Sequence, residues 1–173
     1  MPADEVVAIV RLLGDHGIRV CVDGGWGVDA LLGEQTRPHA DLDIAVEHKD
    51  VPASRRLLAE RGYQDVRRDD SWECNFVLGN DQGYQVDIHS YTFDEKGELV
   101  FGVAYPCDSL EGSGAIGGMP VRCITPEWLV KFHSGYALDE NDAQDVRRLC
   151  QRFGITIPEE IDKVMNIPDL NGS

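Results

Sequence analysis

The chain has 173 residues, a hydrophobic content of 42% and a mean hydropathy of −0.28, which are typical of a globular protein with one domain or one domain plus a small appendage. No apolar run approaches the roughly 20 residues that span a bilayer, and the acidic first fifteen residues do not resemble a secretory signal. The formal net charge of −15 disfavours a nucleic-acid partner, because an acidic surface repels phosphate backbones. This charge would attract a small cationic substrate, although solubility alone also explains it.

The cysteines are scattered and odd in number. No two of the five form a C-x-x-C pair, which argues against a zinc ribbon or a disulfide framework. We therefore expect free thiols in a reducing compartment, and hence a cytoplasmic protein. These residues are Cys21, Cys74, Cys107, Cys123 and Cys150.

Hydrophobic patterning predicts alternating helices and strands in the first two thirds of the chain and helices afterwards. We predict helices over 4–15, 26–32, 52–61, 125–136, 141–153 and from Pro158, and strands over 19–23, 41–47, 63–68, 73–78, 84–91 and 120–124. Residues 93–119 are rich in turn formers, which predicts loops and short strands. The sequence thus predicts an α/β domain over 1–124 and a helical C-terminal part over 125–173.

Two carboxylates alternate on the strand predicted over 41–47. Asp41 and Asp43 stand at i and i+2, so both side chains point to one face, about 6–7 Å apart along the chain, while Leu42 and Ile44 point to the core. Close carboxylates repel each other unless a cation lies between them, and Mg²⁺ prefers carboxylate oxygens together with substrate phosphates. The pair predicts a magnesium site, although D-x-D alone fits a solvated sheet face better.

A glycine pair strengthens this prediction. Gly24 and Gly25 follow one predicted strand and precede the helix over 26–32. Glycines let the backbone approach a phosphate closely, and a helix N-terminus offers unpaired N–H groups. A tight turn also needs glycine for its own sake, but the order strand, G-G, helix, D-x-D is more specific than either motif. It predicts a phosphate cradle beside a metal site; the sequence assigns no role to the preceding Asp23.

A third carboxylate and a histidine lie on the strand predicted over 84–91. Asp87 shares a face with His89, while its neighbours point inward. Three carboxylates can hold two metal ions, and Asp87 could also accept the proton of an attacking hydroxyl. His89 would orient the site or the nucleotide, or serve as a polar partner on that face.

The loop before the D-x-D strand supplies two further candidates for nucleotide binding. Arg37 could neutralise a β- or γ-phosphate, the alternative being a surface arginine among many acids. His39 lies in the same loop and is a second candidate for binding the nucleotide.

Four segments carry a resemblance to a known family. They are C-V-D-G-G-W-G-V-D-A-L-L-G, R-P-H-A-D-L-D-I, Y-Q-V-D-I-H and F-H-S-G-Y, in this order and spacing. The chain resembles the lincosamide nucleotidyltransferases and, more distantly, the aminoglycoside 2″-nucleotidyltransferases, from its first helix to about Arg148. Both are small members of the polymerase-β-like nucleotidyltransferase superfamily. The resemblance implies a small mixed sheet flanked by helices, an α+β (α/β) fold with a helical C-terminal part.

The resemblance also implies an antibiotic-modifying enzyme that transfers AMP from Mg²⁺-ATP to a hydroxyl group and releases pyrophosphate. In this family pattern, Asp41 and Asp43 match the metal-binding pair, Asp87 matches a third carboxylate acting as metal ligand or general base, and the glycine pair matches the triphosphate-binding turn. Glu73 matches a further acid and is a second candidate for the base. Three residues of the F-H-S-G-Y stretch are implied to flank the nucleotide: His133, Ser134 and Tyr136.

The acceptor is the least specified part of the prediction. The match is loose over 90–118, where aromatic residues such as Tyr105 are candidate pocket walls. The resemblance favours a lincosamide (lincomycin or clindamycin), whereas the charge of −15 leans towards a cationic aminoglycoside. Other small-molecule or protein acceptors, and a non-catalytic nucleotide-binding protein, are alternatives. No nucleic-acid or membrane partner is expected, and a homodimer is a further expectation.

Overall fold

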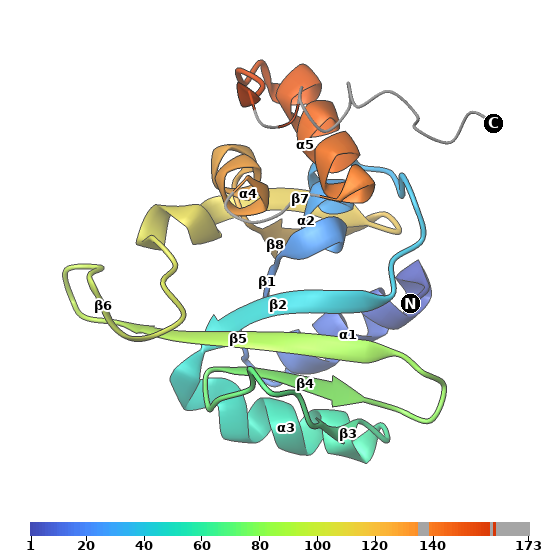
Figure 1. The fold of residues 1–173 in the computed structure, drawn as a ribbon. Helices are drawn as coiled ribbons and strands as arrows, with labels where there is room; N and C mark the ends of the chain where they lie inside the picture. Colours follow the sequence, from blue (N-terminus) through green and yellow to red (C-terminus); the bar gives the residue numbers. More distant parts are fainter. Residues whose placement is uncertain (135–138, 160, 162–173) are drawn as a thin grey trace. The chain divides into compact units, whose positions relative to one another are not determined.

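The computed structural model describes residues 1–134, 139–159 and 161 (Figure 1). The chain divides into two compact units, Met1–Thr125 and Pro126–Ser173. The first holds the sheet and three helices, and the second holds two helices within its described part.

The helices of the first unit bury one face each. In α1 (Ala3–Asp15), the buried residues Val6, Ile9 and Leu13 recur at intervals of three and four, which places them on one side of the helix. Helix α2 (Gly24–Leu32) ends at Gly33, whose φ of 77° closes the helix in the left-handed conformation. A short 3₁₀ turn, η1 (His48–Asp50), leads into α3 (Val51–Glu60).

The strands form one mixed eight-stranded sheet with the order β3-β4-β5-β2-β1-β8-β7, and β6 pairs with β5 outside this path. Strands β2 and β5, and strands β1 and β8, pair in parallel, while the remaining pairs are antiparallel. The strands are β1 (Cys21–Val22), β2 (Asp41–Glu47), β3 (Gln64–Val66), β4 (Asn75–Gly79), β5 (Gln85–Phe93), β6 (Leu99–Gly102), β7 (Gly112–Ile116) and β8 (Met119–Cys123).

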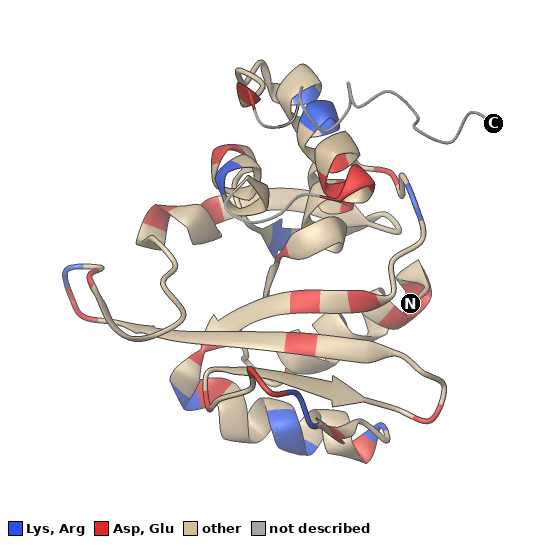
Figure 2. Cartoon of the chain, in the orientation of Figure 1, with Lys and Arg blue, Asp and Glu red and all other residues tan. Residues whose placement is uncertain are grey.

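Alternation along β2 and β5 separates the core from the polar face of the sheet. Leu42, Ile44, Val86 and Ile88 are fully buried and belong to one apolar cluster with residues of α1, α2 and α3. The residues between them point to the opposite face, where Figure 2 shows acidic positions next to each other on the two strands. The expected α/β fold, a mixed sheet flanked by helices, is confirmed.

The second unit contains α4 (Pro126–His133) and α5 (Glu140–Phe153). Helix α5 begins with a capping box in which Asp139 and Asp142 satisfy each other's backbone amides, and it ends at Gly154 with a φ of 69°. Beyond the turn that follows, Glu159 and Ile161 are helical. Across both described units, no helix is both long and apolar enough to cross a membrane.

The main differences from the predicted elements lie at element ends. Strand β1 has two residues rather than the five predicted over 19–23, because Asp23 leaves the strand to cap α2. The glycine pair is therefore the first turn of α2 and not a break before it. Residues 93–119 contain the end of β5, then β6, the 3₁₀ turn η2 (Cys107–Glu111) and β7.

Candidate active site

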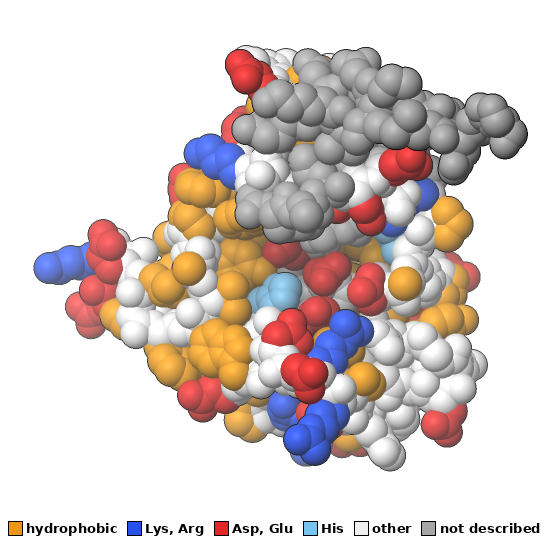
Figure 3. Space-filling model, in the orientation of Figure 1, with side chains coloured by type: hydrophobic (Ala, Val, Ile, Leu, Met, Phe, Trp, Pro, Cys, Tyr) orange, Lys and Arg blue, Asp and Glu red, His pale blue; other side chains and the backbone are white. Residues whose placement is uncertain are grey.

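The parallel pairing of β2 with β5 brings three carboxylates to one face of the sheet. In this pairing Asp43 stands directly opposite Asp87, and Asp41 stands opposite Gln85. Paired residues of neighbouring strands are about 5 Å apart and point the same way, so all three acids lie on the polar face. Figure 3 shows acidic side chains gathered there, beside a histidine and next to a group of basic side chains.

The electrostatics of this face indicate an excess of negative charge. Burial raises the pKa of Asp43 well above its ordinary value, and the nearby charges of Asp41, Asp23 and Asp87 raise it further. Burial also raises the pKa of Asp87, against the opposing effects of His89 and Arg68. These shifts follow from acids that must share a small volume with too little positive charge.

The glycine pair is packed directly against the site. Gly24 has a φ of 56°, and a Cβ atom there would lie 2.9 Å from Cγ of Asp43 and closer still to Oδ2 of that residue. A Cβ atom on Gly25 would collide with the ring of His39 and lie 2.9 Å from a guanidinium nitrogen of Arg37. The turn thus lies next to one D-x-D carboxylate and both candidate residues of the preceding loop.

A buried aspartate fixes the loop that carries His39. Asp29 on α2 accepts hydrogen bonds from Thr36 N at 3.1 Å and Thr36 Oγ1 at 2.7 Å, and its other oxygen bonds Nε2 of His39. The His39 ring also packs on Trp26, with centroids 4.8 Å apart. These contacts orient Nδ1 of His39 towards Gly25, at the start of α2.

A second network of hydrogen bonds connects the start of α2 with β5 across the polar face. The carboxylate of Asp23 accepts the amide of Gly24 at 2.8 Å, which caps α2, and also accepts the hydroxyl of Tyr105 at 2.6 Å. The same hydroxyl lies 3.0 Å from Nδ1 of His89, whose Nε2 lies 3.4 Å from Oδ1 of Asp87. Burial and the charge of Asp23 raise the pKa of Tyr105 well above its ordinary value, so the phenol stays protonated.

The donor set fits a divalent cation. Oδ1 of Asp87 is buried and has no hydrogen-bond partner. A bound cation could supply the missing partner of this oxygen. Within residues 1–134, 139–159 and 161, no three His, Cys, Asp or Glu side chains stand close enough to form a complete metal cage. Mg²⁺ does not need such a cage, because it commonly takes one or two carboxylates and completes its shell with water and substrate phosphates.

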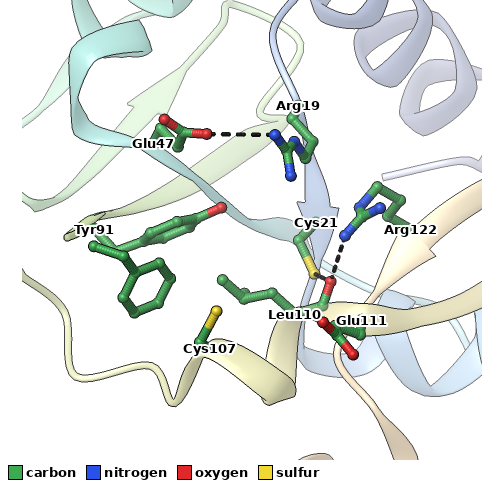
Figure 4. Close-up of a pocket in the computed structure, with 9 residues that line it drawn as sticks. Arg19, Cys21, Glu47, Tyr91, Cys107, Leu110, Glu111 and Arg122 are labelled. Atoms are coloured by element: carbon green, nitrogen blue, oxygen red, sulfur yellow. Dashed lines mark hydrogen bonds and ion pairs between the residues drawn. The ribbon is translucent and has the colours of Figure 1, made fainter. Parts of the chain in front are cut away.

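A separate small cavity lies further along the same face (Figure 4). Its volume is about 110 Å³, and its lining includes Arg19, Glu47, Tyr91 and Arg122. The two side chains Arg19 and Glu47 form an ion pair of 3.7 Å. The cavity is smaller than the roughly 300 Å³ at which ligand pockets begin, so it is not assigned to the candidate active site.

The comparison with known families agrees with this geometry. The family model described as aminoglycoside-2″-adenylyltransferase matches residues 5–149. The chain belongs to this family.

Individual relatives of the chain are named for two antibiotic classes. A lincosamide resistance protein of Staphylococcus haemolyticus is 28% identical over 84% of this chain and 92% of its own length. A 2″-aminoglycoside nucleotidyltransferase of Escherichia coli is 25% identical over 79% of this chain and 77% of its own length. The chain therefore carries the fold and family of antibiotic nucleotidyltransferases.

Solved structures show the same likeness. The lincosamide antibiotic adenylyltransferase LnuA in its lincomycin-bound form superposes with a TM-score of 0.76 at 26% identity, over 90% of this chain and 99% of that one. The enzyme ANT(2″)-Ia, in complex with adenylyl-2″-tobramycin, superposes with a TM-score of 0.74 at 18% identity, over 94% of this chain and 93% of that one. The second likeness concerns the fold alone.

Glu73 is not brought to the carboxylates by any contact that the structure shows. It lies in the tight turn between Trp72 and Asn75, before β4 begins, and not on the strand predicted over 73–78. It is exposed and shares a surface pocket with Arg55 and Asp65. The residue of β4 opposite Asp87 is Val77, so the register gives Asp87 an apolar neighbour on that side.

The three residues implied by the F-H-S-G-Y stretch belong to the second unit. Nδ1 of His133 lies 2.9 Å from the carbonyl oxygen of Leu129, and Oγ of Ser134 donates to the carbonyl oxygen of Val130 at 2.7 Å. Both side chains thus contact the preceding turn of their own helix. Tyr136 lies outside the described residues. Their implied role in nucleotide binding stays a prediction.

The sequence did not predict the contacts that four residues of the site make. Asp23 caps the start of α2 and Asp29 fixes the loop that carries His39. Tyr105 joins Asp23 to His89, and Arg68 acts with His89 to lower the pKa of Asp87. An aspartate before G-G is an N-cap signal that could have identified the first. The other three contact residues of other elements or of an irregular loop, for which the sequence carries no local signal.

Proposed function

We propose that this chain is an antibiotic nucleotidyltransferase that transfers AMP from Mg²⁺-ATP to a hydroxyl group of a lincosamide and releases pyrophosphate. The observation that carries the proposal is the register of β2 and β5, which sets Asp43 opposite Asp87 beside the turn at Gly24. The 28% identity to a lincosamide resistance protein supports the choice of acceptor.

The metal would be held by Asp41 and Asp43, with Asp87 as the third ligand. When bound, Mg²⁺ supplies positive charge that offsets the charge on the phosphoryl oxygens. Burial and, after it, the repulsion of the neighbouring acids raise the pKa of Asp43, which supports this assignment because a bound cation would relieve the repulsion.

The start of α2 is the proposed binding site of the triphosphate. The amide of Gly24 is bonded to the Asp23 carboxylate and the amide of Gly27 to the Asp23 carbonyl, so the amides of Gly25 and Trp26 remain as first-turn donors. A helix N-terminus favours anions. Arg37, whose guanidinium lies beside Gly25, adds a positive charge at the same place.

Asp87 is the proposed general base. Burial raises its pKa, and its Oδ1 makes no hydrogen bond, so one carboxylate oxygen could accept a proton from a hydroxyl while the other contacts the metal. In this reaction the O–H bond of the acceptor breaks, its oxygen bonds the α-phosphorus, and pyrophosphate leaves. The position of Glu73, outside β4 and exposed, makes it the weaker candidate.

An aminoglycoside is the second candidate acceptor. Two observations favour it: the name of the matching family, and a net charge of −15, which would attract a polycationic substrate. A lincosamide carries a single basic amine and gains less from this charge. The two acceptors therefore differ in their expected sensitivity to salt, because screening weakens the binding of the polycation more strongly.

The test is a pyrophosphate-release assay with lincomycin, clindamycin and tobramycin as acceptors and each of the four nucleoside triphosphates as donor. Mass spectrometry of the product identifies the transferred group. We expect adenylylated lincosamide with Mg²⁺ and none after chelation. Asp43→Asn should abolish release, whereas the matched change Asp81→Asn, in the exposed β4–β5 turn, should not. Full release by Asp43→Asn would contradict the proposal.

Two further expectations accompany the proposal. A homodimer would be detected by sedimentation of the purified chain, and a cytoplasmic location by fractionation of the producing cell. Neither outcome alters the assignment of the carboxylates.

A further inference from the structure

Arg68 is a basic side chain of the carboxylate face to which the proposed reaction assigns no role. It lies in the exposed segment between β3 and β4, and its Nη2 donates a hydrogen bond to Oε1 of Gln85 at 2.7 Å. Gln85 begins β5 and stands opposite Asp41 of the D-x-D strand. Side chains of paired residues point the same way, so this bond holds the guanidinium on the face where Figure 3 shows basic side chains next to the acids.

The partner of Arg68 leaves its charge uncompensated. Burial raises the pKa of Asp87 and the charges of His89 and Arg68 lower it, which places the guanidinium within electrostatic range of that carboxylate. Among the residues that the structure describes, however, no carboxylate lies within ion-pair distance of Arg68, and its partner is the neutral amide of Gln85. A carboxamide oxygen accepts a hydrogen bond without carrying a charge. The positive charge of Arg68 therefore remains available to an anion that enters the site.

Arg68 and the start of α2 lie on opposite sides of the D-x-D strand. The start of α2 adjoins β2 from the side of β1, because the amide of Asp23 donates to the carbonyl oxygen of Asp43 at 2.9 Å. The residue that holds Arg68 belongs to β5, on the other side of β2. The proposed reaction needs the α-phosphorus within reach of Asp87 on β5, while the terminal phosphates occupy the start of α2. The α-phosphate is therefore the phosphate on the side of Arg68.

We propose that Arg68 contacts the α-phosphate of ATP, the group that is transferred as part of AMP, and that Gln85 is a positioning residue that holds Arg68 for this contact. This inference rests on the proposed nucleotidyl transfer and adds a residue that contacts the donor substrate. The guanidinium donors match the oxygens of a phosphate, and their charge offsets that of the α-phosphoryl group during transfer. Arg68 keeps its proton throughout and forms no covalent bond.

Two other roles of Arg68 lead to different expectations. An arginine that only covers the surface would behave like Arg67, its exposed neighbour, which lines a surface pocket with Arg55 and Asp65. An arginine that contacts the acceptor would affect the binding of a lincosamide and not that of AMP. Replacing Arg68 should leave the fold intact, because the side chain is exposed and bonds one partly buried side chain.

The experiment measures by calorimetry, with Mg²⁺ present, the binding of AMP and of inorganic pyrophosphate, the two parts of ATP that the reaction separates. In Arg68→Gln, AMP should bind roughly tenfold more weakly and pyrophosphate as in the wild type, because a hydrogen bond to a charged group is lost from the α-phosphate alone. The matched control Arg67→Gln should bind both ligands as the wild type does. Unchanged AMP binding in Arg68→Gln, weaker pyrophosphate binding in that variant, or an equal loss in Arg67→Gln would overturn the proposal.

Gln85→Met tests the positioning role. Methionine has a similar length but offers only a weak acceptor to the guanidinium, so this variant should also bind AMP more weakly than the wild type does. In the double variant Arg68→Gln/Gln85→Met, the two losses should not multiply, because both remove the same contact with the α-phosphate. Losses that multiply fully would show that Gln85 acts independently of Arg68 and would overturn its role.

Failure of the proposed function is distinguishable from failure of this inference. A wild type that binds AMP and pyrophosphate but transfers AMP to no acceptor refutes the function, whereas the binding comparison still tests Arg68. A wild type that transfers AMP, together with an Arg68→Gln variant of unchanged AMP affinity, refutes the inference alone. A wild type that binds neither ligand refutes both.

Discussion

The carboxylate of Asp43 occupies the space that a side chain on residue 24 would need, since a Cβ atom built on Gly24 would lie 2.9 Å from Cγ of Asp43. This contact joins the turn at Gly24, the proposed phosphate-binding site, to the D-x-D strand. Neither motif alone reveals it, and it gives the glycine a role that goes beyond its φ of 56°. The close approach places the proposed metal-binding carboxylate and the start of α2 within reach of one substrate.

Gly24→Ala should abolish nucleotidyl transfer and destabilise the protein. The new methyl group would displace Asp43, and a left-handed conformation costs an L-residue roughly 1–2 kcal/mol. For a chain of this size, we expect the melting temperature to fall by about 2–8 °C. Pyrophosphate release and thermal unfolding measure the two effects.

Gly33→Ala is the matched control for backbone strain. Gly33 has a φ of 77°, but a Cβ atom there would meet nothing within 4 Å. This variant should lose similar stability and retain transfer. Equal losses of transfer in the two variants would show that strain, and not contact with Asp43, accounts for the effect.

Asp43→Asn should make the metal-free protein more stable at neutral pH. Burial and the acids around it raise the pKa of Asp43, so the folded state binds its proton more tightly than the unfolded state. The stabilisation from that proton is complete below the ordinary aspartate pKa of about 3.9 and is lost as pH rises through the raised value. Asparagine removes this loss, so we expect Asp43→Asn to have the higher melting temperature at neutral pH.

The measurement is the melting temperature as a function of pH with a chelator present. The curves of wild type and Asp43→Asn should converge at acid pH and separate towards neutrality. Added Mg²⁺-ATP should raise the melting temperature of the wild type and leave that of Asp43→Asn unchanged. A variant that is less stable than the wild type at neutral pH would contradict the assignment of Asp43.

Asp29→Ala should destabilise the first unit strongly. Asp29 is 2% exposed and bonds His39 and two atoms of Thr36, so its removal leaves a buried ring and a loop without their partner. Breaking a buried pair in this way costs roughly 3–5 kcal/mol. Urea unfolding measures the loss.

Thr36→Val should destabilise the first unit less than Asp29→Ala does. It removes the hydroxyl that donates to Asp29 at 2.7 Å and keeps the backbone amide bond of Thr36. The expected cost is about 1 kcal/mol. If both variants unfold at the same urea concentration, the His39 contact contributes little and this account of the loop is wrong.

One thiol should react quickly with a thiol reagent in the folded protein. All five cysteines are free, and Cys107 is the exposed one. Burial raises the pKa of Cys123 to about 12 and that of Cys21 higher still, which suppresses their reactive thiolates. Titration with a chromogenic disulfide should show one fast group, and Cys107→Ser should remove it; two fast groups in the wild type would contradict the burial.

Much of the fold could be predicted because its signals are local. The strand over 41–47 matches β2 residue for residue, since its alternation places Leu42 and Ile44 in the core and both aspartates on the other face. Helix ends also followed from local residues, as at Gly33 and Gly154. Asp87 could be identified as a site candidate for the same reason as the D-x-D pair: it alternates with buried residues along its strand.

The contacts that assemble the site could not be predicted in this way. Tyr105 and Asp23 are separated by 82 positions, and Asp29 reaches His39 through a loop whose path has no hydrophobic pattern. Glu73 illustrates the reverse error, because its neighbours suggested a strand that begins only at Asn75. Pairing partners and side-chain bridges arise from tertiary packing, which overrides local preference.

The backbone ladder between β2 and β5, and not the chain that links them, decides which carboxylates meet. The connection from one strand to the other runs through α3, β3 and β4, and its turns are exposed. Lengthening a flexible surface loop costs little free energy, since the entropic penalty grows only with the logarithm of its length. The turns at 67–71 and 80–83 should therefore accept inserted residues, such as a peptide tag, without separating Asp43 from Asp87.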